Sequence, residues 1–345
     1  MLSPANRHDS LDLHAAEPFH LLAVADDVQP EEIDILAGQI WTGCSRLGPG
    51  LLELEKEAYL TGPWDLTPEA IVGLGLPSRL KFAYLAGVPA LRGKPVPQWL
   101  QDCDPLWDAF REGGPEGLEL EVLQGLRRMA RRLAGALRFS TGPIIVPDPD
   151  SAVSLRVLSE IWLEPAACLQ VVQRALPIAT LLMGNETEQT QRSSGPKTPQ
   201  LTTPEERANY DPDGLRSRIQ SGVSPDERAW LHAEAEAYDE AAMSMPMMVD
   251  AYAIAADVTQ KSAVHVVVQG ETAIPPALGH SEDGCVSYAI SWIAPEITIT
   301  EESKLKRAMR LDRLTVIDAI EAVARELAEA TNGVIIDQDD FVVSL

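Results

Sequence analysis

The sequence predicts an α+β fold made of two related units, each an antiparallel sheet with helices on one face. The first observation is a spacing of Ala, Arg, Leu, Gly and Ile residues that residues 122–155 and 316–345 share. The second is the likeness between FHLLAVADDV (19–28) and VDAYAIAADV (249–258). A pattern that recurs within one chain indicates a repeated supersecondary unit. We expect a ferredoxin-like arrangement in each unit, with the two units joined by a polar linker.

The predicted units divide the chain into four segments. We expect a loose N-terminal arm over 1–18, a first unit with insertions over 19–185, a polar linker over 186–225 and a second unit over 226–345. The linker prediction depends on composition, because a segment with few large apolar residues buries too little surface to offset the entropy of ordering.

Local signals define the elements of the first unit. We predict, in order, a strand over 19–25, a helix beginning at Pro30, a strand around 80–84, a helix over 116–138, a strand over 144–146 and a helix over 165–176. Proline suits the first turn of a helix, and Glu31 and Glu32 favour the positive end of the helix dipole. The many Gly and Pro residues of 42–118 favour short elements and loops there.

Alternation and capping signals define the second unit. We predict, in order, a helix over 225–243, strands over 249–255, 264–268, 286–292 and 297–300, a helix after residue 315 and a strand over 334–336. Alternating apolar and small residues over 286–292 are typical of a half-buried antiparallel strand. Thr315 and Asp318 form a capping box at the predicted helix start, and Asn332-Gly333 supplies a left-handed stop.

The chain is strongly acidic. Its 345 residues include 52 Asp and Glu against 28 Lys and Arg, which gives a formal net charge of −24. Such a charge repels nucleic acid and anionic lipid surfaces and attracts basic molecules. We therefore expect a basic protein partner, no direct contact with nucleic acid and no membrane. The alternative is that the negative charge only keeps the protein soluble.

Cysteine usage and the lack of apolar runs favour the cytoplasm. Cys44, Cys103, Cys168 and Cys285 lie far apart without CxxC or His–Cys spacing, which argues against zinc sites and disulfides. The first residues lack a basic region followed by an apolar stretch, and no uninterrupted run of about 18 apolar residues occurs. We therefore expect a cytoplasmic protein.

Clustered aspartates follow both predicted closing strands. Asp148 and Asp150 lie in IIVPDPD, and Asp337, Asp339 and Asp340 lie in IIDQDD. Clustered carboxylates are ligands for hard cations such as Mg²⁺ or Ca²⁺, which makes these five the candidates for a metal site. Aspartate is also common in turns, because its side chain hydrogen-bonds the nearby backbone, and we favour this second interpretation. We assign no catalytic residue and no cofactor.

Two basic groups interrupt the acidity. Arg127, Arg128, Arg131, Arg132 and Arg138 lie on the first long helix, and Lys304, Lys306, Arg307, Arg310 and Arg313 precede the second. Phosphate or RNA binding is one interpretation. The other is a face that is solvated or neutralised within the molecule by an acidic neighbouring element, and we favour it because no aromatic residues for base stacking accompany either group.

Histidine and cysteine form one further constellation. His280 and Cys285 lie together in GHSEDGC, where a Cys–His pair would serve as nucleophile and base. Catalytic partners generally come from separate elements, so we interpret this segment as a turn. His265, inside a predicted strand, is interpreted as a packed or edge side chain rather than a ligand, and His20 occupies a comparable position in the first unit.

The C-terminal stretch ARELAEATNGVIIDQDDFVVSL (324–345) resembles the closing helix and strand of small α+β domains in bacterial toxin-immunity-type proteins. In those domains an alanine-rich helix ends in Thr-Gly-Gly or Thr-Asn-Gly before an apolar strand and an Asp turn. The likeness covers one helix–strand segment per unit, and the first unit departs from it by Pro143 and Pro147, which flank its strand. The resemblance implies a role in binding a partner protein and carries over no functional residue.

Three functional hypotheses follow. We rank first an acidic interaction protein that binds, and neutralises, a basic protein partner in the manner of an immunity protein or inhibitor. The second is an enzyme with a site in a cleft between the two units, where the two Asp clusters would face one another. The third is a subunit of a larger, phage-related assembly. We lean away from an enzyme, because no GxGxxG after a strand, Walker A loop, GxSxG or HExxH occurs.

Overall fold

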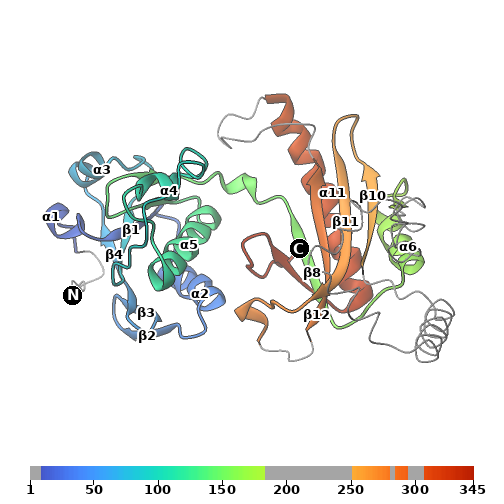
Figure 1. The fold of residues 1–345 in the computed structure, drawn as a ribbon, viewed down its shortest axis with the longest axis horizontal. Coiled ribbons are helices and arrows are strands. Elements are labelled where there is room, and N and C mark those ends of the chain that lie inside the picture. Colours follow the sequence, from blue (N-terminus) through green and yellow to red (C-terminus); the bar gives the residue numbers. More distant parts are fainter. Residues whose placement is uncertain (1–8, 183–250, 280–283, 294–306) are drawn as a thin grey trace, which may run out of the picture. The chain divides into compact units, whose positions relative to one another are not determined.

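The computed structural model describes residues 9–182, 251–279, 284–293 and 307–345 (Figure 1). Apart from Leu182, these residues belong to one compact unit of the chain. They form helices and two separate antiparallel sheets, of seven and six strands. The prediction of an α+β fold with two sheet units is therefore confirmed. The predicted linker, the helix over 225–243, the strand over 297–300 and the first eight residues of the arm lie outside the described residues.

The first sheet has the strand order β2-β3-β4-β5-β1-β6-β7. Its strands and helices are α1 (Leu13–Ala16), β1 (His20–Val24), α2 (Pro30–Ile40), β2 (Ser45–Gly48), β3 (Leu51–Glu55), β4 (Ala58–Asp65), α3 (Pro68–Leu74), β5 (Phe82–Gly87), α4 (Pro105–Ala109), α5 (Gly117–Arg132), β6 (Ala136–Arg138) and β7 (Ile144–Ile145). β1 lies between β5 and β6 and is antiparallel to both, so the first strand of the sheet occupies an interior position.

Helices cover both faces of the first sheet. On one face α2 and α5 contribute Ile33 and Leu126 to a core that includes Leu22 of β1. On the other face, Ile71 of α3 lies in a second core with Leu21 of β1. Every residue of β1 is buried for this reason, as expected of a strand that is covered on both sides.

The second sheet has the strand order β13-β8-β12-β11-β10-β9. Its elements are η1 (Pro149–Ser151), β8 (Leu155–Ser159), α6 (Pro165–Ala175), β9 (Thr180–Leu182), β10 (Ala251–Asp257), β11 (Ala263–Glu271), η2 (Pro276–Leu278), β12 (Cys285–Ile293), α11 (Arg307–Thr331) and β13 (Val334–Asp337). β8 lies between β12 and β13 and is antiparallel to both.

Within the described residues, helices cover one face of the second sheet. Ile320 of α11 packs into the same core as Val266 of β11, and α6 adds further apolar side chains to it. On the opposite face the strand register aligns Ala253, Val267 and Ala289 in one row, and all three residues are partly exposed. The two faces of this sheet therefore differ in burial.

The two sheets share one strand order. In each, a first strand (β1 or β8) is followed by a helix (α2 or α6), four further strands, a long helix (α5 or α11) and a last strand (β6 or β13) that returns beside the first. The first sheet adds β7 at its edge. The shared β-α-β-β-β-β-α-β pattern has two strands more than the ferredoxin-like pattern, so the ferredoxin-like arrangement stays a prediction.

The structure changes two of the strand correspondences drawn from sequence. Residues 249–258, matched to 19–28, contain β10, which stands where β3 stands in the first sheet, whereas β8 takes the place of β1. Likewise β7, which contains the matched Ile144 and Ile145, is the additional edge strand, and β6 corresponds to β13. Short apolar runs occur in every buried strand, so a short likeness does not identify which strand it is.

The boundary between the sheets also differs from the prediction. The predicted first unit ends at residue 185, yet β8 within it pairs Val157 with Tyr288 on one side and with Ile335 on the other, both in the second sheet. Residues 183–250 therefore fall, in sequence, between two strands of one sheet (β9 and β10) rather than between two units.

For two helices that pack on the first sheet, one predicted end is confirmed and one is wrong. α2 begins at Pro30 as predicted, and Gln29 and Glu32 form a capping box in front of it. α5 ends at Arg132 rather than at the predicted residue 138, and Ala134 adopts a left-handed conformation with φ of 48°. Residues 136–138 form β6 instead of the last turn of a helix.

The end of α11 agrees with the prediction, but its start does not. Asn332 follows the helix with a left-handed φ of 49°. The helix begins at Arg307, so Thr315 lies in its interior, where the hydroxyl donates to the carbonyl oxygen of Leu311 at 3.3 Å. The predicted capping box is therefore wrong. Neither α11 nor another described helix has the length and apolarity that a membrane span needs.

Candidate functional site: an arginine–aspartate network

Helix α5 presents apolar side chains on one side and arginines on another. Val122 and Leu126 are completely buried against the first sheet. Arg128 and Arg132 lie one helical turn apart with Arg131 beside them, so their guanidinium groups project from neighbouring parts of the helix surface. The helix thus carries a compact group of positive charges that points away from the core it helps to form.

The turn after β13 is built around one aspartate. The carboxylate of Asp337 accepts hydrogen bonds from the backbone N–H groups of Asp339 at 2.9 Å and Phe341 at 3.0 Å. Asp340 adopts a left-handed φ of 67°, which lets the chain reverse direction there. Phe341 is 1% exposed and lies in the core of the first sheet. This turn therefore places three carboxylates and a buried aromatic ring at defined positions.

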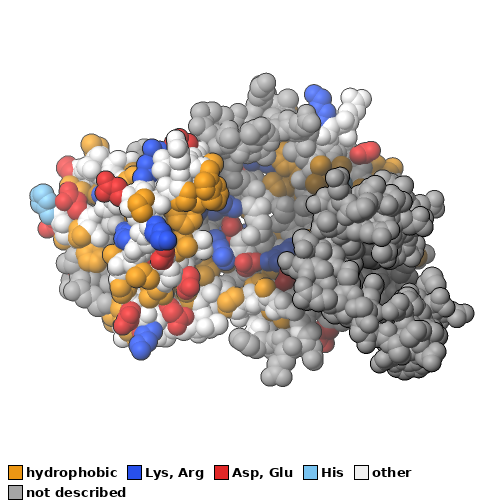
Figure 2. Space-filling view, in the orientation of Figure 1, with side chains coloured by type: hydrophobic (Ala, Val, Ile, Leu, Met, Phe, Trp, Pro, Cys, Tyr) orange, Lys and Arg blue, Asp and Glu red, His pale blue; other side chains and the backbone are white. Residues whose placement is uncertain are grey.

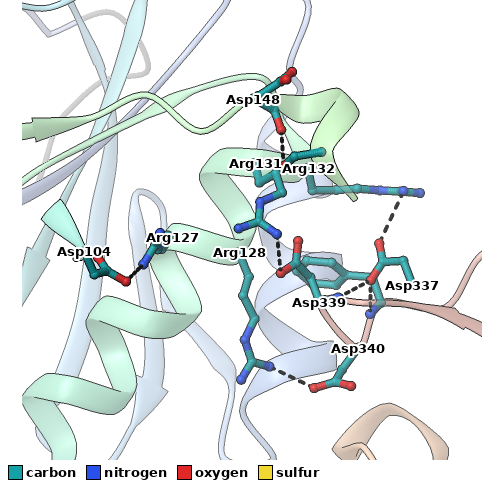
Figure 3. A network of polar contacts seen from close by, with 11 residues as sticks. Asp104, Arg127, Arg128, Arg131, Arg132, Asp148, Asp337, Asp339 and Asp340 are labelled. Carbon is teal, nitrogen blue, oxygen red and sulfur yellow. Dashed lines mark hydrogen bonds and ion pairs between the residues drawn. The ribbon is translucent and has the colours of Figure 1, made fainter. Parts of the chain in front are cut away.

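Three arginines of α5 pair one to one with the aspartates of this turn, while Arg127 of the same helix pairs with Asp104 (Figure 3). The pairs are Arg128 Nη1 with Asp340 Oδ2 at 3.2 Å, Arg131 Nη1 with Asp339 Oδ1 at 3.3 Å, and Arg132 Nη1 with Asp337 Oδ2 at 3.5 Å. Arg156 of β8 also pairs with Asp340. The basic face of α5 and the acidic turn after β13 thus neutralise one another. The sequence alone does not connect these two features.

The first aspartate cluster, Asp148 and Asp150, pairs with a different arginine, Arg313 of α11. Asp148 Oδ2 is 3.1 Å from Arg313 Nη1, and Asp150 Oδ2 is 3.6 Å from Arg313 Nη2. The other oxygen of Asp148 accepts the backbone N–H of Asp150 at 3.1 Å, which caps η1. Both acidic clusters are therefore hydrogen-bonded turns that also pair with arginine, and the prediction that an acidic neighbour neutralises the basic residues is confirmed for Arg128, Arg131 and Arg132.

The arrangement suits ion pairing better than a metal ion. Among the described residues, no group of three or more His, Cys, Asp or Glu side chains is placed to hold a metal. A guanidinium beside a carboxylate already supplies the positive charge that a cation would bring, and its donors occupy the oxygens that a hard cation needs.

Burial alters the acid strength of the two inner aspartates. Asp337 is 4% exposed and Asp339 is 8% exposed. Burial raises the pKa of both carboxyl groups, while the backbone N–H donors of Asp337 and the arginine beside each carboxylate act in the opposite direction. The network therefore contains two carboxyl groups that accept a proton more readily than ordinary aspartates.

Two cavities border this network. One, of about 220 Å³, is lined by Arg131, Asp337 and Asp339, among others, and the second, of about 440 Å³, is lined by Arg128 and Trp41, among others. Neither is lined by a serine, cysteine, histidine or lysine, so neither offers a nucleophile with a base beside it. The chemistry that the lining residues offer is proton transfer by carboxyl groups that are already paired with arginine.

A buried histidine forms a second polar group that the sequence did not reveal. His20 is 4% exposed, and its Nδ1 accepts the backbone N–H of Ser140 at 3.1 Å. Nε2 must therefore carry the proton, which it donates to Glu119 at 3.1 Å. Glu119, 1% exposed, also pairs with Arg92 at 2.8 Å. A glutamate within the apolar stripe of α5 was the available signal, because charge on a buried helix face requires a partner.

Of the other histidine and cysteine residues weighed as nucleophile, base or ligand in the sequence, His265 and Cys285 are described. His265 is partly exposed on β11, in agreement with its place in a strand. His280 lies outside the described residues. Burial raises the pKa of the Cys285 thiol, which disfavours the thiolate that a nucleophile requires.

Comparisons of the chain with protein-family models, with curated proteins and with solved structures gave no match.

Proposed function

We propose that this chain is an acidic interaction protein that binds a basic protein partner, in the manner of an immunity protein or inhibitor. The observation that carries this proposal is a difference between basic and acidic side chains in how many of them form ion pairs within the chain. Among the described residues, most arginines form ion pairs within the chain, whereas a set of exposed carboxylates forms none.

The arginines are engaged in ion pairs distributed over both sheets. Each of the following lies within 4.0 Å of a carboxylate: Arg46, Arg92, Arg111, Arg127, Arg128, Arg131, Arg132, Arg156, Arg174, Arg313 and Arg325. An arginine held this way contributes little positive field at a distance, because its charge is cancelled locally.

Exposed carboxylates without such a partner are found on both sheets. Among the described residues, these acids are exposed and form no ion pair within 4.0 Å: Asp26, Asp27, Glu57, Glu112, Glu160, Glu164, Asp257, Asp318 and Glu329. Figure 2 shows acidic side chains spread over the visible described surface among basic and apolar ones. These described carboxylates therefore lie where a partner can approach them.

The physical consequence is electrostatic steering of cationic proteins. An uncancelled negative surface raises the rate of encounter with a basic partner, and this attraction weakens once salt shortens the Debye length to about 8 Å or less. The resemblance of residues 324–345 to toxin-immunity-type domains adds neutralisation of the partner to the proposal.

Salt-dependent capture tests the proposal. The full chain is immobilised, exposed to a cell extract at low, physiological and high salt, and the retained proteins are identified by mass spectrometry. We expect basic proteins to dominate the retained set and to be lost as salt rises. The leading basic protein is then purified and titrated directly, and its dissociation constant should weaken steeply with salt.

A variant separates specific binding from bulk charge. Replacing Arg111, an exposed residue in a surface ion pair, with glutamine makes the chain one unit more negative and should leave capture unchanged or slightly stronger. Retention of acidic proteins that is indifferent to salt would contradict the proposal.

A further inference from the structure

One cavity of the first sheet combines aromatic walls with an acidic rim. It measures about 240 Å³, and its lining includes Asp26 before α2, Pro63 of β4, and Phe82 and Tyr84 of β5. Tyr84 is 5% exposed and belongs to the core, so one wall is fixed by packing. The volume is below that of typical sites for drug-sized ligands, which are roughly 300–1,000 Å³, and suits a single side chain.

The charge around this cavity is negative. Asp26 and Asp27 are exposed and pair with no described Lys or Arg within 4.0 Å. Glu31 and Glu32 lie in the first turn of α2, where they offset the positive end of the helix dipole. The base next to the lining residue Phe82 in sequence is Lys81, which forms no ion pair within 4.0 Å among the described residues. The four acids outnumber this single base. The cavity mouth therefore favours a cation over an anion.

The chain already contains an example of the same chemistry. The guanidinium carbon of Arg92 lies 4.1 Å from the centre of the Phe110 ring, while its Nη2 lies 2.8 Å from Glu119. An aromatic face and a carboxylate together hold a guanidinium well, because the flat ion stacks on the ring and donates to the oxygens. Phe82 and Asp26 supply the same two kinds of group to the lining of the cavity, and no described arginine is among its lining residues.

We infer that this cavity, which we call the Asp26–Phe82 pocket, accepts an arginine side chain of the basic partner. The inference rests on the proposed function and gives the partner one point of attachment. Arginine suits the pocket better than lysine, since an ammonium group is strongly hydrated and does not stack in the same way.

A small probe locates the binding position. N-acetyl-arginine amide is titrated into the isotopically labelled full chain, and backbone amide shifts are followed by NMR, with N-acetyl-citrulline amide as the uncharged match. We expect saturable shifts at Asp26, Gln29, Phe82 and Tyr84 with the arginine probe and at least tenfold weaker binding of citrulline. Equal shifts at unrelated acids such as Glu112, or equal binding of citrulline, would overturn the pocket.

Variants test the two groups separately, with hexa-arginine peptide as the ligand and fluorescence anisotropy as the readout. Asp26→Asn keeps the shape of the pocket and should weaken binding roughly threefold to tenfold. Phe82→Leu keeps the charge and should weaken it similarly, and this loss should persist at high salt because stacking is less screened. Glu112→Gln, which removes an exposed acid elsewhere on the first sheet, should change affinity less than twofold.

The outcomes distinguish the pocket from the wider proposal. If hexa-arginine binds in a salt-dependent way but Asp26→Asn behaves like Glu112→Gln, the pocket is wrong and the acidic binding surface stands. If hexa-arginine does not bind at low salt, the proposed function itself fails. Asp26 is exposed, so its variant remains informative even if Phe82→Leu destabilises the fold.

Discussion

The two sheets have the same strand order but different surroundings. In the first sheet α2 and α5 cover one face and α1 and α3 the other, and β1 is buried throughout. In the second sheet α6 and α11 cover one face, whereas Ala253, Val267 and Ala289 on the opposite face are partly exposed. The difference arises in the connections: α3 joins β4 to β5, while the described part of the corresponding connection between β11 and β12 holds only η2. Strand order and burial are therefore set by separate parts of the sequence.

The largest expected effect on stability concerns Phe341, which follows a strand of the second sheet but packs in the core of the first. Phe341 follows β13 but is buried in the first core, so Phe341→Ala should lower the free energy of unfolding by about 3–5 kcal/mol. Val342→Ala, at the neighbouring and 38% exposed position, should cost less than about 1 kcal/mol. Urea denaturation of both variants measures the difference. Equal losses would mean that the Phe341 ring does not fill the first core.

The next effect compares the covered face of the first sheet with the face of the second sheet that is partly exposed among the described residues. Leu21→Ala, on the face of β1 beneath α1 and α3, should lower the free energy of unfolding by about 2–5 kcal/mol. Val267→Ala, on the partly exposed face of β11, should lower it by about 1 kcal/mol or less, because less apolar surface is lost. Thermal and urea unfolding provide the measurement. A similar loss at Val267 would show that this face is covered in solution.

A smaller effect separates equivalent arginines of the two long helices. Arg131 of α5 pairs with the buried Asp339, whereas Arg325 of α11 pairs with Glu321 on an exposed helix surface. Arg131→Gln should therefore cost about 1–3 kcal/mol, since it leaves a buried carboxylate without its cation. Arg325→Gln should cost about 0.3–0.5 kcal/mol. High salt should reduce the second cost and leave most of the first.

The smallest effect is a dependence on pH. The pKa of Asp337 and Asp339 lies above the ordinary 3.8 in the folded chain, so the folded state binds their protons in preference. Their favourable contribution is complete below that ordinary value and is lost as pH rises through the folded pKa. The double variant Asp337→Asn with Asp339→Asn should thus lose less stability than the parent between about pH 4 and pH 7. Urea unfolding across this range tests the sign, and an identical slope would contradict it.

Local features of the fold are predictable from the sequence, and non-local ones are not. Pro30 and Asn332 mark real helix ends, because the proline ring and the left-handed asparagine act within one turn of chain. Thr315 misleads, because α11 begins two turns earlier at Arg307 and the Thr315 hydroxyl donates to the Leu311 carbonyl oxygen inside the helix. Residues 155–159 fall within the predicted first unit, although as β8 they belong to the second sheet, because their partners, β12 and β13, lie far along the chain.

The network shows the same limit. Neutralisation of the α5 arginines by an acidic element is predictable from charge alone, but the identity of that element as the turn after β13 depends on tertiary structure. The pairing of His20 with Glu119 also joins residues far apart in sequence: a glutamate within the apolar stripe of α5 indicates that a partner exists but does not identify it. The signals that identify ends of elements are short-range, whereas those that join elements are not.

The position of Phe341 has a consequence for how the protein is made. On the ribosome, this residue follows β6 by about two hundred residues, at a synthesis rate of roughly 5–20 residues per second. For roughly 10–40 s the nascent first sheet therefore lacks the Phe341 ring that completes its core. Translation speed over the intervening stretch, and holding by chaperones during that interval, become determinants of yield.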